Sequence, residues 1–211
     1  MSASALPFLE LSPVIPVVTL PEAALAIELA GALAAGGVPI VEVTLRSPAA
    51  WEGIAAIRDA LPAVAVGAGT VWTADQLDRA IDAGARFAVS PGAPPALLEH
   101  SARRAFPLLA GAQTATEIAA LRDAGAEAVK FFPAQPAGGA RAVAALSAVF
   151  PGLAFCPTGG IDADNAGEYL GLPCVPCVGG SWLAPRDALS ARDWRAVEAR
   201  AQEAVARWGR A

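Results

Sequence analysis

The feature that most constrains the fold is a repeated alternation between short apolar runs and alanine-rich segments with helical spacing. Near-continuous apolar runs that alternate with helices are typical of buried parallel strands. The eight runs span residues 14–20, 38–45, 63–70, 87–92, 106–112, 128–133, 153–160 and 174–182. Capping boxes at Thr73 and Thr114 begin two of the helices between them, and Gly84 and Gly125 follow helix ends. This eightfold repeat predicts an α/β protein that closes as a (β/α)8 TIM barrel.

The length of the chain predicts a single domain. The 211 residues lie near the lower end of what a closed eight-stranded barrel needs, so we expect one domain over residues 1–211, with residues 1–12 as an N-terminal extension. Hydrophobic residues make up 55%, yet Gly, Pro or a charge interrupts every apolar run before the roughly 18 residues of a membrane span. The first residues do not resemble a secretory signal. We therefore expect no membrane partner and a cytoplasmic location.

Charge and cysteine usage argue against several kinds of partner. The net charge is −5 and the arginines are scattered, which does not favour nucleic acid. Cys174 and Cys177 match the letters of a redox or metal motif, but an offset of three along a strand points the two thiols to opposite faces. His100, the only histidine, falls in the expected helix after the fourth strand. We expect neither a metal site nor a cofactor.

Lys130 is the only lysine in a chain that has fourteen arginines. Arginine stays protonated and cannot act as a nucleophile, whereas a desolvated lysine can lose its proton and attack a ketone. Lys130 lies in the apolar run AVKFFP, where alternation places Phe132 on the same side. The alternative is an ordinary surface charge, which is uncommon in a phenylalanine-rich strand. We interpret Lys130 as a candidate nucleophile.

Glu42 and Lys130 each stand five residues after a helix-ending glycine, Gly37 and Gly125. If the repeats are equivalent, the two side chains leave their strands at the same height and face each other across the barrel, which they could nearly bridge with one water between them. A carboxylate placed there can transfer protons. The alternative for Glu42 is a structural ion pair with Arg46, four residues later. Arg46 otherwise suits a bidentate contact with a substrate carboxylate.

Glycine pairs end the last two expected strands, and Thr70 ends the third. Thr70 closes GAGT and offers a hydroxyl and backbone amides. TGG ends at Gly160, and GGS ends at Ser181, with helix starts expected at Asp162 and after Pro185. Glycine amides at the ends of strands 7 and 8 of such barrels bind phosphate, although glycine pairs are also ordinary turn material.

The motifs EVTLR, VGAGT, SPG, KFFPA, CPTGGI and GGSW stand in order over nearly the whole chain. Together they resemble the 2-keto-3-deoxy-6-phosphogluconate (KDPG) aldolase family, which includes 4-hydroxy-2-oxoglutarate aldolases. The resemblance implies a metal-free homotrimer of barrels that acts on a phosphorylated 2-keto acid, with Lys130 as the Schiff-base lysine and Glu42 as the general acid/base. It further implies that Arg46 and Thr70 hold the carboxylate, that Pro91 and Phe132 line the pocket, and that Thr158 contacts the substrate chain. The implied phosphate site consists of Gly159, Gly160, Gly179, Gly180 and Ser181.

Two departures from the family pattern are modest, and two other activities stay open. Gln113 stands where the family usually has serine, and the N-terminal extension is short. The segment SPAAWEGI after Arg46 is similar to phosphogalactonate aldolases, which resemble the chain less at Arg46, Thr158 and Ser181. An isomerase or epimerase with Glu42 as base and Lys130 as an electrostatic aid is another alternative, as is a sugar-phosphate-binding protein without catalysis.

Overall fold

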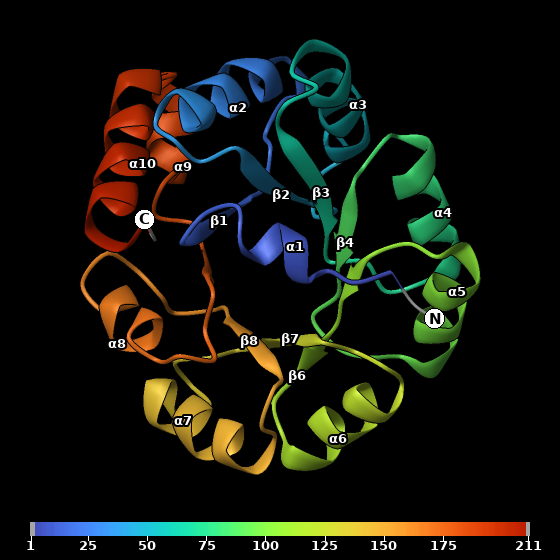
Figure 1. Ribbon diagram of the computed structural model, residues 1–211. Coiled ribbons are helices and arrows are strands. Elements are labelled where there is room, and N and C mark those ends of the chain that lie inside the picture. The colour runs from blue at the N-terminus through green and yellow to red at the C-terminus, as the bar shows by residue number, and fades with distance from the viewer. Residues whose placement is uncertain (1–2, 210–211) are drawn as a thin grey trace.

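The computed structural model describes residues 3–209 and shows two parallel sheets with helices around them (Figure 1). The larger sheet has the strand order β5-β4-β3-β2-β1-β9, and the smaller has the order β6-β7-β8. The strands are β1 (Val14–Val18), β2 (Ile40–Thr44), β3 (Ala65–Gly69), β4 (Phe87–Val89), β5 (Leu108–Leu109), β6 (Gly111–Ala112), β7 (Ala128–Phe131), β8 (Ala154–Pro157) and β9 (Val178–Gly180). The α/β class is confirmed.

The helices follow the strands along the chain and lie outside both sheets, except at the N-terminus (Figure 1). They are α1 (Leu6–Leu9), the 3-10 helix η1 (Ala23–Leu25), α2 (Ala26–Ala35), α3 (Ala50–Ala60), α4 (Ala74–Asp82), α5 (Pro95–Arg104), α6 (Ala115–Asp123), α7 (Gly139–Val149), α8 (Ala166–Leu170), α9 (Arg186–Ala191) and α10 (Trp194–Trp208). Part of the expected N-terminal extension, residues 1 and 2, lies outside the described residues.

The expected closed eight-stranded barrel is wrong, because the fifth apolar run forms two short strands that belong to different sheets. β5 pairs with β4, whereas β6 pairs with β7. The change of partner falls at Ala110, whose carbonyl accepts the Lys130 N–H at 2.9 Å. The next residue, Gly111, lies so close to the backbone of Pro91 that a Cβ there would overlap it. Strand pairing therefore breaks where the chain after β4 crosses this segment.

The second interruption of the expected barrel lies between β8 and β9. Across the described part of the chain, the bridge between Thr158 and Gly179 is the one pairing between these two strands. Pro176 comes immediately before the residues that would extend the pairing, and proline has no N–H to donate to a ladder. The two sheets are consequently joined by an isolated bridge rather than by a continuous ladder.

The helix α1 covers one end of the strands and leaves the other end for a site. The Phe8 ring of α1 stacks on Phe87, the first residue of β4, with ring centroids 4.9 Å apart. Because all the strand pairs are parallel, this contact places α1 over the amino ends of the strands. Every residue of β2 and β3 is buried, so the centre of the larger sheet belongs to the core.

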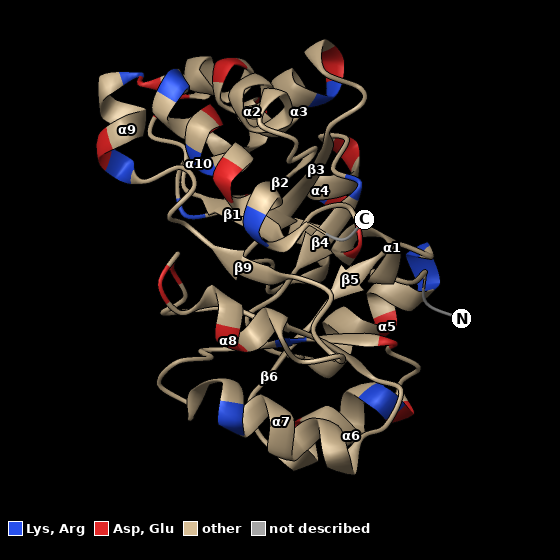
Figure 2. Cartoon of the chain, turned by 60° about the vertical axis from the view of Figure 1, so that its left-hand side comes forward, with Lys and Arg blue, Asp and Glu red and all other residues tan. Residues whose placement is uncertain are grey.

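Charged side chains lie mainly on the helices, and the strands are almost free of them (Figure 2). Glu42 and Lys130 are the exceptions among the strand residues. Among residues 3–209, no helix combines the length and the apolar character that crossing a membrane would require.

The two expected capping boxes form, and they predict a pH effect on stability. Glu117 accepts the N–H groups of Gln113 and Thr114, each at 2.8 Å, and these backbone hydrogen bonds lower its pKa. Because the pKa of Glu117 is lower in the folded state, its charged carboxylate stabilises the fold at pH values above the ordinary glutamate pKa. This stabilisation is lost as the pH falls below about 4. We expect Glu117→Gln to lower the free energy of unfolding by about 1 kcal/mol at pH 7, and by much less at pH 3.5, in urea titrations.

The second capping box supplies a matched control for this effect. Gln76 accepts the Trp72 and Thr73 N–H groups at 2.7 and 3.3 Å but cannot titrate. Gln76→Ala should therefore destabilise the protein to a similar extent at both pH values. A Glu117→Gln penalty that does not change with pH would contradict the charge-based explanation.

Candidate active site

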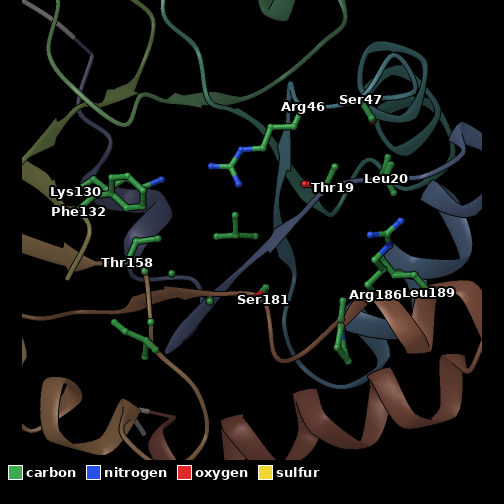
Figure 3. Close-up of a pocket in the computed structure, with 18 of the residues that line it drawn as sticks. Thr19, Leu20, Arg46, Ser47, Lys130, Phe132, Thr158, Ser181, Arg186 and Leu189 are labelled. Atoms are coloured by element: carbon green, nitrogen blue, oxygen red, sulfur yellow. The ribbon is translucent and has the colours of Figure 1, made fainter. Parts of the chain in front are cut away.

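A cavity of about 700 Å³ opens at the carboxyl ends of the strands. Its lining comes from β1, β7 and β9, from the segments that follow β1, β2, β7, β8 and β9, and from α9 (Figure 3). Nine residues singled out in the sequence line it: Arg46, Lys130, Phe132, Thr158, Gly159, Gly160, Gly179, Gly180 and Ser181. Residues far apart in the chain thus meet in one cavity.

Lys130 projects from β7 into this cavity and is almost wholly buried. Its neighbours on the adjacent strands are Gly111 and Cys156, and its side chain is 6% exposed. The Nζ atom lies 3.5 Å from Oε1 of Glu42 and 5.2 Å from the centre of the Phe132 ring. The amine therefore has one carboxylate partner and one aromatic wall in a site that is largely protected from solvent.

Glu42 comes from the larger sheet, so its contact with Lys130 joins the two sheets. Its side chain is 4% exposed, and its residue pairs with Val17 on β1 and Gly67 on β3. Glu42 itself does not line the cavity, but its carboxylate lies beside Lys130, which does. The spacing argument placed these two residues opposite each other, and the structure brings them into direct contact.

Gly69 makes room for the Glu42 carboxylate, a role that sequence reasoning missed. Gly69 pairs with Thr44, and this register puts it diagonally across from Glu42 on the same face of the sheet. A Cβ at Gly69 would overlap Oε1 of Glu42. Any larger side chain there must displace the Glu42 side chain from its position beside Lys130.

We expect Gly69→Ala to lower the kcat of a reaction that uses this lysine and carboxylate pair about a hundredfold, because a displacement of roughly 1 Å at a catalytic group has an effect of that size. The matched control is Gly67→Ala on the same strand, where a Cβ would overlap the Phe87 ring instead of Glu42. This variant should lose about 1–3 kcal/mol of stability through overpacking, with a smaller change in kcat. Equal kcat values for the two variants would refute the role of Gly69.

Arg46 lies in the loop after β2, and its guanidinium reaches into the cavity (Figure 3). It is exposed, and among residues 3–209 it has no ion-pair partner. The structural Glu42–Arg46 ion pair considered from the sequence is therefore not formed. The next residue, Ser47, also lines the cavity, and its buried Oγ has no hydrogen-bond partner in the described structure. The Arg46 guanidinium is therefore available to a ligand, and the Ser47 hydroxyl keeps an unused hydrogen-bonding group in the cavity wall.

Thr70 and Pro91 were expected at the pocket but do not line it. Thr70 follows β3 with a left-handed backbone, φ = 63°, which is costly for a β-branched residue. Pro91 follows β4 and packs against Gly111. Thr70 is adjacent to Gly69 and so lies close to Glu42, while Pro91 supports the crossing beside β6.

The glycine-rich ends of β8 and β9 form the wall of the cavity that the sequence assigns to phosphate. Gly159 and Gly160 have φ values of 101° and 75°, a conformation that favours glycine. A Cβ at Gly179 would overlap Oγ1 of Thr158, so the bridge between these residues requires glycine. The helix α8 begins at Ala166, four residues after the start expected at Asp162, and Asp162 instead caps the turn before it, where its Oδ1 accepts the Asp164 and Asn165 N–H groups at 3.0 and 3.2 Å.

The cavity is cationic although the whole chain is acidic. Arg46, Lys130 and Arg186 line it, and none of its described lining residues is acidic, against a net charge of −5. Two residues that line the cavity, Arg186 and Thr19, were missed from the sequence. The Thr19 hydroxyl lies 2.7 Å from the Thr44 hydroxyl. The position of Arg186 just after GGS was a usable signal. A ligand with more than one negative group fits this charge distribution.

The chain is similar over most of its length to known aldolases. The KDPG and KHG aldolase family matches residues 7–200. A 2-dehydro-3-deoxy-phosphogluconate aldolase of Pseudoalteromonas atlantica is 46% identical, over 92% of this chain and 90% of the relative. A KHG/KDPG aldolase of Escherichia coli is 44% identical, over 96% of this chain and 95% of the relative.

Solved structures agree with this relationship. A KDPG aldolase from Legionella pneumophila, with pyruvate captured as a covalent carbinolamine, is 42% identical and has a TM-score of 0.91, over 93% of this chain and 95% of that one. A structure described as native KDPGal is less similar, with 30% identity and a TM-score of 0.78, over 92% and 96% of the two chains. The chain is therefore a lyase that belongs to the KDPG and KHG aldolase family.

Proposed function

We propose that this aldolase cleaves 2-keto-3-deoxy-6-phosphogluconate to pyruvate and glyceraldehyde 3-phosphate through a Schiff base on Lys130. The observation that carries the proposal is the buried pair of Lys130 and Glu42, with Nζ and Oε1 3.5 Å apart at the edge of a cationic cavity. An amine nucleophile and a carboxylate that can exchange protons with it are the two groups that this chemistry requires. The carbinolamine in the Legionella enzyme supports the same chemistry here.

The proposed reaction begins with the neutral Lys130 amine, which adds to the C2 ketone of the substrate. The carbinolamine loses water to give an iminium ion, which then accepts electrons. The C4 hydroxyl gives up its proton, the C3–C4 electron pair moves into an enamine, and the aldehyde leaves. The enamine is protonated at C3, and water hydrolyses the resulting iminium to pyruvate and free lysine. Glu42, adjacent to Nζ, is the group that we assign to these proton transfers.

The ends of the substrate are assigned from the charge of the cavity wall. Arg46 reaches the centre of the cavity, where its fork of donors can take the carboxylate beside C2 in a bidentate contact (Figure 3). The amides around Gly159, Gly160, Gly179, Gly180 and Ser181 are assigned to the phosphate. Thr158 and Phe132 lie between these regions and are assigned to the substrate chain. Thr70 and Pro91 do not line the cavity and are assigned no direct contact with the substrate.

Reductive trapping tests the proposal directly. Borohydride added in the presence of pyruvate should attach a three-carbon carboxyethyl group to Lys130, located by peptide mass spectrometry. The same treatment without pyruvate is the control. A protein that releases pyruvate from the phosphorylated keto acid but is never modified at Lys130 would exclude the Schiff base and favour a mechanism in which Lys130 acts only through its charge.

Two further expectations rest on the family resemblance. The E. coli relative carries the name KHG/KDPG aldolase, which supports a second activity on 4-hydroxy-2-oxoglutarate, giving pyruvate and glyoxylate. The homotrimer is the other expectation and stays a prediction. A glyoxylate assay would test the second activity, and sedimentation of the purified chain would test the homotrimer. The cytoplasmic location, expected from the sequence itself, also stays a prediction.

A further inference from the structure

Arg186 is a cavity residue to which the proposed mechanism gives no role. It is the first residue of α9 and lines the same cavity as Lys130. The Ala184 N–H donates to the Ser181 carbonyl at 3.2 Å, and the Leu189 N–H donates to the Pro185 carbonyl at 3.1 Å. One turn followed directly by a helix thus leads from Ser181 to Arg186. The backbone therefore ties the position of Arg186 to the glycine-rich end of the cavity.

The Arg186 guanidinium is available to a ligand. Figure 3 shows it across the cavity from Lys130 and Phe132. The side chain is exposed, and it has no hydrogen-bond or ion-pair partner within residues 3–209. Its sequence neighbour Asp187 does not line the cavity, and neither does any other described acidic residue. The positive charge is thus directed into an anion-binding cavity without a counter-charge of its own.

We propose that Arg186 is a specificity-determining residue that binds the phosphate of the substrate. This inference rests on the proposed function, which supplies a substrate with a carboxylate at one end and a phosphate at the other. Backbone amides hold such an anion by fixed dipoles, whereas a guanidinium adds full charge and can form two parallel hydrogen bonds to phosphate oxygens. Arg46 and Arg186 then bind the two anionic ends of one substrate chain, with Lys130 placed at its ketone.

The test compares phosphorylated and unphosphorylated substrates in Arg186→Gln. For 2-keto-3-deoxy-6-phosphogluconate, kcat/KM for pyruvate release should fall about tenfold. The fall should come from a higher KM, with kcat nearly constant. For 2-keto-3-deoxygluconate, which lacks the phosphate, the loss should be much smaller. Because Arg186 is exposed, the difference between variant and wild type should shrink as salt rises toward 1 M. Arg186→Lys should recover part of the loss.

Arg195→Gln is the matched control. Arg195 is exposed on α10 and does not line the cavity, and its replacement changes the net charge by the same amount as Arg186→Gln. An equal loss on both substrates, or no loss on either, would overturn the role of Arg186. If the wild-type chain releases no pyruvate from either substrate, the proposed function has failed, and the Kd for inorganic phosphate then decides the inference. Calorimetry should still show weaker phosphate binding in Arg186→Gln, and an unchanged Kd would exclude phosphate binding by Arg186.

Discussion

Lys130→Arg should abolish pyruvate release, with a loss of at least about a million-fold in kcat, the order of magnitude for removal of an enzymic nucleophile. Arginine keeps the positive charge but stays protonated at any pH at which the protein is folded, so it cannot add to a ketone. The replacement therefore separates covalent catalysis from electrostatic assistance. The measurement is a coupled assay for pyruvate, together with borohydride trapping followed by mass spectrometry.

The alternative isomerase or epimerase predicts a different result for the same variant. If Lys130 acted only through its charge, Lys130→Arg would keep part of the activity, and the trapping reaction would modify neither protein. Because Lys130 is buried, its replacement can also disturb packing, so unfolding in urea must be compared with that of the wild type. Lys130→Met is the control for size, since it keeps an unbranched chain of similar length without charge. Residual activity of Lys130→Arg well above that of Lys130→Met would contradict the Schiff-base assignment.

The class of fold and the centre of the site could be predicted because their signals are local. Apolar runs separated by helix signals predicted a parallel α/β protein, and a lysine within an apolar strand indicated a special role. The equal spacing of Glu42 and Lys130 from helix-ending glycines also predicted that the two side chains face each other, and they lie 3.5 Å apart. Each of these inferences uses a pattern within one repeat unit, or the same position in two equivalent units, and the periodicity of side chains then determines which face they occupy.

The predictions that failed, and the site residues that were missed, concern features that depend on contacts between repeats. The break at Ala110 follows from the approach of Pro91 to Gly111, and the weak link between β8 and β9 follows from strand pairing near Pro176. No periodicity within the fifth run distinguishes one long strand from two short ones. The role of Gly69 likewise depends on the register between β2 and β3. Arg186, the first residue of α9, was missed because its approach to the cavity depends on the turn between Ser181 and Pro185, which only the folded chain reveals.

Glu42→Gln should lower kcat about 10²- to 10⁴-fold, the usual contribution of a general acid/base. Glutamine has nearly the same shape but cannot take up a proton, so the variant tests proton transfer rather than packing. If Glu42 transfers protons, iminium formation at Lys130 should also be slower in the variant. Borohydride trapping with pyruvate should then need a longer incubation than in the wild type. A kcat within a few-fold of the wild type would assign the proton transfers to another group or to solvent.

The same variant has a second effect, on stability, because Glu42 is the single ion-pair partner of Lys130 in the described structure. Removing one member of a buried ion pair leaves the other charge uncompensated, which typically costs about 3–5 kcal/mol, whereas replacing both by apolar groups can be neutral. Glu42→Gln should therefore unfold at lower urea concentrations than the wild type at pH 7, and the double variant Glu42→Gln, Lys130→Met should recover much of the loss. A double variant no more stable than Glu42→Gln would mean that the pair is not the source of the penalty. Recovered stability without recovered activity would show that this buried pair is kept for catalysis and not for folding.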